Sequence, residues 1–168
     1  MKKSFILILT AALLGGCSGN AELKGGEVRS DEPAITGIGG IFFESDNPVE
    51  TMKWYERTMG LKTDPYGAVF EFRNGINNDE QNYLRWSTHQ PSDSLFQPSS
   101  KPFMINYRVH NIEGLIARMQ ANGVEPLDTL AAYPYGKFIH FMDPNGIKIE
   151  LWEPVDSVLT AMGGVTNK

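Results

Sequence analysis

The sequence is poor in the residues that define several protein classes. It contains a single cysteine, Cys17, so no disulfide can form within one chain. It contains three histidines, and it has no run rich in lysine and arginine. Because the formal net charge is −5 and no basic cluster is present, we expect no nucleic-acid partner.

Long hydrophobic runs are also missing. The longest apolar stretch, Phe5–Leu14, is too short to cross a bilayer comfortably. Two lysines precede it and the letters LGGC, ending at Cys17, follow it, which is the order of a signal peptide. The segment resembles a bacterial lipoprotein signal, in which the cysteine is lipidated and becomes the new N-terminus. An ordinary cleaved signal peptide that ends near a cysteine is the alternative.

A lipidated Cys17 implies a membrane-anchored protein of the bacterial cell envelope, held by acyl chains such as palmitate. We therefore predict a signal peptide over residues 1–16. Residues 17–34 are rich in glycine, serine and charged side chains, and we expect them to form a flexible tether. A folded domain is predicted over residues 35–154, followed by a C-terminal tail, residues 155–168, with a short helical turn over DSVLTAM.

The folded part contains the same series of elements twice. The first series is a strand over ITGIGGIFFES, a helix over NPVETMKWYERTMG, and strands over LKTDPY, GAVFEFR and NYLRWST. The second series is a strand over KPFMINYRV, a helix over NIEGLIARMQANG, and strands over VEPLDTL, GKFIHFMD and IKIELWE. We therefore predict an α+β fold of two tandem βαβββ modules, about residues 35–90 and 101–154.

Glu150 lies in the last predicted strand, just after the tight-turn sequence Asp143–Gly146. Side chains alternate between the two faces of a strand, so Glu150 shares a face with Lys148 and Trp152. The apolar residues between them form the other face, which we expect to pack on a helix. The carboxylate therefore faces away from that helix.

Three stretches, GIGGIFFESDNPVETMKWYERTMGL, KPFMINYRV and HFMDPNGIKIELWEP, resemble the vicinal oxygen chelate superfamily of glyoxalases, bleomycin-resistance proteins and extradiol dioxygenases. The resemblance implies that each module curls its sheet into a half-barrel with a helix on the convex side. It also implies that the two concave faces line one shared cavity, and that a homodimer is a possible assembly. In the metalloenzymes of the family this cavity holds a divalent metal on strand residues.

Glu150 matches the last of the metal-ligand positions that the resemblance implies. The other positions fall on Gly39, on Met104 and near Arg85. A glycine offers no donor, and a thioether and a guanidinium do not suit a hard divalent ion. We therefore expect no metal and no other cofactor. The histidines match none of the positions and are expected to be exposed, capping or packed; they are His89, His110 and His140.

The residues that would surround the cavity are of mixed character, which suits a small organic molecule. If Gly39 and Met104 mark the concave face, then Ile41 and Phe43 should share it. The candidate ligand-binding residues on this face or at the cavity mouth are Tyr83, Arg85, Asn106, Arg108, Tyr135, Glu150 and Trp152. The alternative is that Arg85 or Arg108 pairs with Glu150 and closes a dry barrel.

Three functions remain open from the sequence. The preferred one is an envelope-anchored, metal-free protein that binds a small organic molecule. The second is a metal-dependent lyase, isomerase or dioxygenase that uses Glu150 with atypical ligands. The third is an envelope interaction protein with a vestigial cavity.

Overall fold

The computed structural model describes residues 31–75 and 79–168. The predicted signal peptide, Cys17 and most of the predicted tether lie outside the described residues. Within the described ranges, no helix has both the length and the apolar character needed to cross a membrane.

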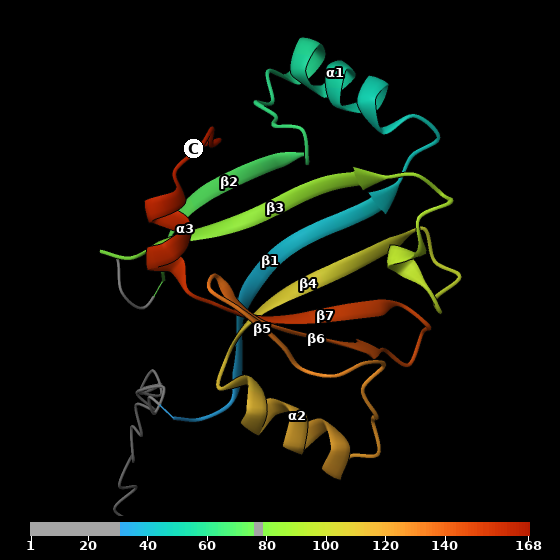
Figure 1. The fold of residues 1–168 in the computed structure, drawn as a ribbon, viewed down its shortest axis with the longest axis vertical. Helices are drawn as coiled ribbons and strands as arrows, with labels where there is room; N and C mark the ends of the chain where they lie inside the picture. The colour runs from blue at the N-terminus through green and yellow to red at the C-terminus, as the bar shows by residue number, and fades with distance from the viewer. Residues whose placement is uncertain (1–30, 76–78) are drawn as a thin grey trace, which may run out of the picture.

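The elements confirm the predicted α+β class (Figure 1). Over the described ranges they are β1 (Ala34–Glu44), α1 (Pro48–Met59), β2 (Ala68–Arg73), β3 (Gln81–His89), the 3-10 turn η1 (Ser94–Phe96), β4 (Phe103–His110), α2 (Ile112–Ala121), β5 (Ala131–Tyr133), β6 (Gly136–Met142), β7 (Lys148–Pro154) and α3 (Asp156–Met162). The helix α3 corresponds to the helical turn predicted in the C-terminal tail.

The seven strands form one curved sheet in the order β2-β3-β1-β4-β7-β6-β5. In each module the first strand pairs in parallel with the last strand, β1 with β3 and β4 with β7. The two modules join where β1 pairs antiparallel with β4. This repeated order confirms the two-module prediction, and it makes β1 and β4 the centre of the sheet (Figure 1).

The helix boundaries follow from local hydrogen bonds. The Asn47 side chain accepts a hydrogen bond from the Glu50 amide at 3.2 Å, which caps α1, and Gly60 ends that helix at a φ of 72°. The Asn111 side chain caps α2 in the same way, accepting from the Gly114 amide at 3.0 Å. Both caps lie where the sequence placed the helix starts.

Two predicted strands do not form. In the segment LKTDPY, the Asp64 side chain accepts a hydrogen bond from the Tyr66 amide, and Asp64 pairs with Gly67 across a turn. In VEPLDTL, the Leu127 amide makes a single bond to the His140 carbonyl. Each segment contains a proline, which cannot donate to a sheet, so each remains a loop beside the sheet.

The two faces of the sheet are covered by different helices. Both α1 and α2 pack on one face: Tyr55 of α1 contacts Trp86 of β3 with ring centroids 4.8 Å apart, and Leu115 of α2 joins a buried cluster with Leu151 of β7. The opposite face, called the inner face below, carries Glu150 and is contacted by α3. Figure 1 shows α1 and α2 near opposite ends of the sheet and α3 beside β2 and β3.

A bulge in β1 corrects one expectation. The pairing of β1 with β4 shifts register between Ile38 and Gly40, so an extra residue enters β1 at Gly39. A shift of one residue exchanges the two faces of a strand. Phe43 therefore lies on the helix face, with its ring centroid 5.3 Å from that of Trp86, and Ile41 lies on the same side. The prediction that both residues share a face with Gly39 is wrong.

Candidate functional site

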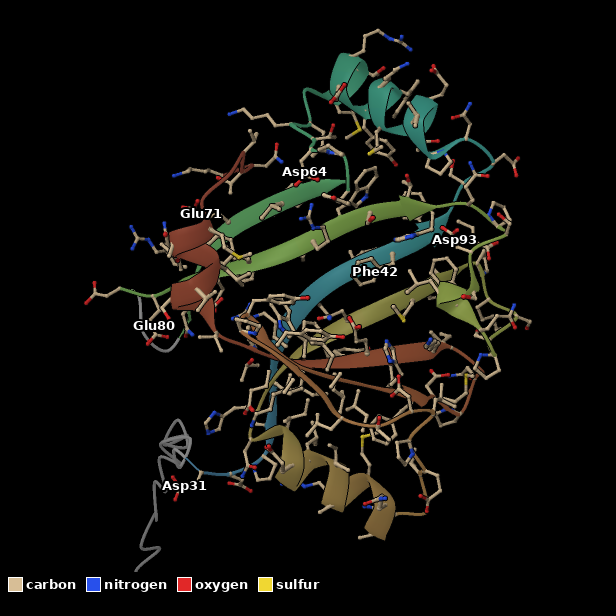
Figure 2. All side chains as sticks on the ribbon, viewed as in Figure 1. Asp31, Phe42, Asp64, Glu71, Glu80 and Asp93 are labelled. Carbon is tan, nitrogen blue, oxygen red and sulfur yellow. The ribbon has the colours of Figure 1, made fainter. Side chains whose placement is uncertain are left out.

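A row of residues crosses the middle of the inner face at Gly40, two positions along β1 from Phe42, which is labelled in Figure 2. The strand register places Arg85 of β3, Gly40 of β1, Asn106 of β4, Glu150 of β7 and His140 of β6 side by side. The next row contains Arg108 paired with Trp152 and Trp152 paired with Phe138. The inner face therefore gathers most of the predicted site residues from both modules.

The Glu150 carboxylate is held by neutral and basic neighbours within the second module. Asn106 donates from Nδ2 to Oε2 at 2.5 Å, and His140 Nε2 lies 3.0 Å from Oε1. The other ring nitrogen, His140 Nδ1, lies 2.6 Å from Asp128 Oδ2. His140 thus stands between two carboxylates, one partly buried and one near the surface.

The two carboxylates favour the protonated form of His140. Burial alone would lower the pKa of His140, but the contacts with Glu150 and Asp128 outweigh burial and raise it above its ordinary value. A protonated His140 compensates the negative charge of Glu150. Neither Arg85 nor Arg108 pairs with Glu150, so the alternative of an arginine–glutamate pair does not hold, and His140 pairs with Glu150 instead.

Arg108 is buried and binds other partners. Its Nη2 donates to Asn82 Oδ1 and to Asp156 Oδ2, both at 2.5 Å, and its Nη1 donates to the Tyr83 carbonyl at 3.2 Å. Its guanidinium carbon lies 5.2 Å from the centre of the Trp152 ring. Because Asp156 is the first residue of α3, the ion pair between Arg108 and Asp156 connects the C-terminal helix to the inner face.

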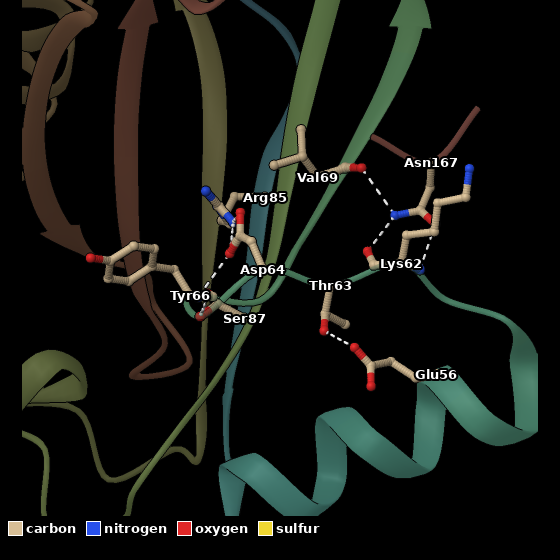
Figure 3. Close-up of polar contacts among 9 residues, drawn as sticks. All are labelled: Glu56, Lys62, Thr63, Asp64, Tyr66, Val69, Arg85, Ser87 and Asn167. Carbon is tan, nitrogen blue, oxygen red and sulfur yellow. Dashed lines mark hydrogen bonds and ion pairs between the residues drawn. The ribbon is translucent and has the colours of Figure 1, made fainter. Parts of the chain in front are cut away.

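Arg85 makes a more open ion pair. Its Nη1 bonds both carboxylate oxygens of Asp64 (Figure 3), at 3.0 Å from Oδ1 and 2.8 Å from Oδ2. Both side chains are about one-third exposed, at 34% and 30%. Asp64 is positioned by the turn before β2, where the Tyr66 amide donates to Oδ1 at 2.8 Å. The pair lies at the edge of a cavity of about 250 Å³.

This cavity lies between the inner face and the C-terminal segment, residues 156–168. The lining residues from the strands and the preceding loop are Asp64, Val69, Tyr83, Leu84, Arg85 and Trp152, and those from the C-terminal segment include Leu159, Met162, Val165 and Thr166. The segment that the sequence indicated to be a tail is therefore one wall of the cavity.

The C-terminal wall is fixed to the sheet at several points. Tyr83 Oη and Thr160 Oγ1 are hydrogen-bonded at 2.8 Å. Near the end of the chain, Asn167 pairs with the edge strand β2: its amide donates to the Val69 carbonyl at 2.8 Å, and its carbonyl accepts from the Glu71 amide. Its side chain also bonds both backbone groups of Lys62 (Figure 3).

The structure brings some of the sequence-predicted residues to the cavity and leaves others beside it. Tyr83, Arg85 and Trp152 line the cavity. Asn106 and Glu150 lie on the same face, but they contact each other and His140 and do not line the cavity. Arg108 is hydrogen-bonded to Asp156 at the start of α3 and does not line the cavity. The remaining residue is Tyr135, which stacks on Tyr133 with centroids 5.4 Å apart and forms part of an aromatic group that ends at Trp152.

Sequence reasoning missed several residues that complete this face. The Asp143–Gly146 turn pairs β6 with β7, and this hairpin register places His140 opposite Glu150. A careful pairing of the two strands from the turn outward could have found that contact. Asp64 and Leu159 gave no comparable signal, because a loop and a C-terminal helix have no register that sequence can fix.

The donor set does not fit the divalent metal site that the family resemblance implies. A Cβ atom added to Gly39 would overlap Asn106 Oδ1 and lie 2.7 Å from the Trp152 ring, so neighbouring side chains already fill the space of a first-strand ligand. Met104 supplies only a thioether. Within residues 31–75 and 79–168, no group of three or more His, Cys, Asp or Glu side chains is placed to hold a metal ion.

The comparisons with known proteins agree with this fold. The family model of the Glyoxalase/Bleomycin resistance protein/Dioxygenase superfamily matches residues 37–151, and the chain belongs to this superfamily. No curated protein matches the sequence.

Two solved structures show the likeness in fold. Methylmalonyl-CoA epimerase from Mycobacterium tuberculosis superposes with a TM-score of 0.51 at 16% identity, over 75% of this chain and 93% of that chain. A methylmalonyl-CoA epimerase variant from Streptomyces coelicolor, in complex with 2-nitronate-propionyl-CoA, superposes with a TM-score of 0.55 at 13% identity, over 73% of this chain and 99% of that chain. At these identities the likeness concerns the fold alone.

Proposed function

We propose that this protein is a metal-free, small-molecule-binding member of the superfamily, anchored at the bacterial cell envelope. The observation that carries the proposal is the cavity of about 250 Å³ between the inner face and the C-terminal segment. Its walls are largely aromatic and aliphatic, and one ion pair, Arg85 with Asp64, supplies charged anchors. Ligand sites commonly combine apolar walls with a few polar groups in this way.

The size of the cavity favours a small ligand. Drug-sized ligands occupy pockets of about 300–1,000 Å³, and this cavity lies just below that range. The Streptomyces coelicolor epimerase binds a coenzyme A derivative, which is much larger than this space. We therefore propose a compact organic ligand for this chain, and we propose no coenzyme A ester.

The state of Glu150 supports binding without a metal. Both of its carboxylate oxygens already have partners, Asn106 and His140. A divalent ion would have to displace at least one of these contacts, and no further hard donor lies at the Gly39 or Met104 position. Burying a carboxylate without a partner is costly, and the histidine and the amide remove that cost.

The first prediction is that the purified protein carries an organic molecule and no stoichiometric divalent metal. Native mass spectrometry should detect the bound molecule, and elemental analysis should find no equimolar Ni, Zn or Mn. Replacing Leu159 with tryptophan should fill the cavity and abolish the bound mass. The matched variant Ser157→Trp adds the same ring on the same helix at a position that does not line this cavity, and it should retain the ligand.

Three results would contradict this proposal. Retention of the ligand by Leu159→Trp would place the binding site elsewhere. A saturable rise in melting temperature with Ni²⁺, Zn²⁺ or Mn²⁺, lost in Glu150→Gln, would put a metal-dependent enzyme first, because only a ligand that prefers the native state stabilises it. If the protein binds neither a small molecule nor a metal, an interaction protein with a vestigial cavity becomes the better proposal.

The second prediction concerns the proposed membrane anchor. Replacing Cys17 with serine should release the protein from the membrane fraction and abolish incorporation of labelled palmitate, because the acyl chains provide the attachment. Fractionation and labelling of cells that express either form measure both effects. Unchanged partitioning of the serine variant would remove the lipoprotein proposal. The possible homodimer stays a separate prediction.

A further inference from the structure

The ion pair at the cavity leaves hydrogen-bonding capacity on both partners. Asp64 contacts the guanidinium of Arg85 through Nη1 alone, at 2.8 and 3.0 Å (Figure 3). An arginine carries five N–H donors, so donors on Nη2 and Nε remain for a ligand. On Asp64, Oδ1 accepts from both Arg85 and the Tyr66 amide, whereas Oδ2 accepts from Arg85 only. A donor and an acceptor therefore lie next to each other.

The charges that line the cavity cancel. Among its described lining residues, Arg85 carries the positive charge and Asp64 carries the negative charge. The other nearby guanidinium, Arg108, is committed to Asp156 at 2.5 Å and gives no net positive charge to the site. A ligand that enters the cavity thus meets a neutral, dipolar wall and not a cationic one.

Most of the other lining side chains are apolar and lie beside that dipole. Tyr83 and Trp152 are 9% and 7% exposed, and they form the wall on the strand side. Leu159 and Met162 form the wall on the C-terminal side. Charge–charge interactions strengthen where water is partly excluded, so an uncompensated charge on a ligand is penalised more here than at an open surface.

We infer that this cavity selects a small, uncharged molecule with an amide-type polar end and an apolar body. The carbonyl oxygen accepts from the free N–H groups of Arg85, the N–H donates to Oδ2 of Asp64, and the apolar body lies between Trp152 and Leu159. A carboxylate would satisfy Arg85 but would place a second negative charge beside Asp64. This inference rests on the proposed binding function and narrows it to one ligand class.

The test uses three probes of nearly equal size: phenylacetamide, phenylacetate and phenethylamine. Each is titrated into the full-length protein at pH 7 and fixed ionic strength, by calorimetry and by the NMR shift of the Trp152 indole. We expect phenylacetamide to bind about tenfold or more tighter than either charged probe, because each charged probe forgoes one of the two hydrogen bonds and opposes a like charge. In Asp64→Asn the wall becomes positive, and the preference should change to phenylacetate.

A matched variant separates charge selection from cavity shape. Leu159→Ala removes apolar wall and leaves the ion pair intact, so it should weaken all three probes and keep their order. Phenylacetate binding to the unmodified protein at least as tightly as phenylacetamide would overturn this inference and leave the binding function standing. The inference would also be overturned if a folded Asp64→Asn variant bound the three probes in the same order of affinity as the unmodified protein. If none of the probes binds the unmodified protein, the proposed function of this cavity fails together with the inference.

Discussion

Replacing Arg108 with methionine is expected to lower the free energy of unfolding by about 3–5 kcal/mol. Arg108 is 4% exposed, and its guanidinium makes three hydrogen bonds, to Asn82, to Tyr83 and to Asp156. Methionine keeps much of the apolar volume but leaves the three acceptors without their donor. Each buried acceptor left unpaired costs about 1–3 kcal/mol, and because the Asp156 side chain is 24% exposed, the expected loss lies in the lower part of the range that three acceptors allow. Urea unfolding at equilibrium measures the change.

A control variant exists on the same face of the sheet. Arg85→Met also removes an arginine paired with an aspartate, but both partners of that pair are about one-third exposed. Exposed ion pairs contribute about 0–1 kcal/mol, so this variant should lose less than about 1 kcal/mol. Equal losses in the two variants would show that Arg108 is not a buried connection between α3 and the sheet. Pairing Arg108→Met with Asp156→Asn should recover part of the loss, because the unpaired carboxylate is then removed.

Much of the fold could be predicted because its signals are local. Asn47 and Asn111 mark the helix starts, and Gly60 marks a helix end. The Asp143–Gly146 turn closes the last hairpin, where the Asp143 side chain accepts from the Asn145 and Ile147 amides at 2.8 and 2.7 Å. Each of these signals involves residues within five positions of one another. The repeated order of elements then indicated the two-module architecture.

The parts of the inner face that were not predicted depend on long-range contacts. Asp64 contacts Arg85 from a turn in which Asp64 pairs with Gly67, whose φ is 127°, and the sequence indicated a strand there. The glycine bulge in β1 exchanged the faces of Ile41 and Phe43. Alternation along a strand is reliable only while the register is continuous, and two adjacent glycines are where a strand most easily departs from it.

The position of the C-terminal segment depends even more strongly on contacts between residues that are far apart in the sequence. The sequence pattern predicted that residues 156–162 form a helix, and this helix is confirmed. Such a pattern does not tell where a helix packs. The position of α3 depends on Arg108, which lies 48 positions before Asp156 in the sequence, and on Tyr83, 77 positions before Thr160. The C-terminal wall of the proposed binding cavity therefore could not be predicted from the sequence.

The hydrophobic core is also less symmetric than the repeat of elements suggests. The buried cluster lies under α2, where the central residues are Val109, Ile112, Leu115, Ile139, Phe141 and Leu151. None of the twelve residues of α1 is fully buried, and Met59 at its end is 67% exposed. The two helices have similar sequences of caps and stops, but only α2 covers its half of the sheet closely.

The second large prediction follows from this asymmetry. Replacing Phe141 with alanine should lower the free energy of unfolding by about 3–5 kcal/mol, because the ring is 0% exposed and its removal leaves a cavity in the cluster under α2. The matched change Phe72→Ala, in edge strand β2, removes a ring that is 39% exposed and should cost less than about 1 kcal/mol.

Urea unfolding of both variants, followed by far-ultraviolet circular dichroism, measures the difference. A larger loss for Phe72→Ala than for Phe141→Ala would mean that another surface covers β2 in solution and that the core is not confined to the second module. The expected order has a consequence for the cavity. Its strand-side walls come from both halves of the sheet, Tyr83 and Arg85 from β3 and Trp152 from β7. Trp152 directly follows Leu151, a member of the buried cluster, so the core of the second module holds this wall of the cavity in place.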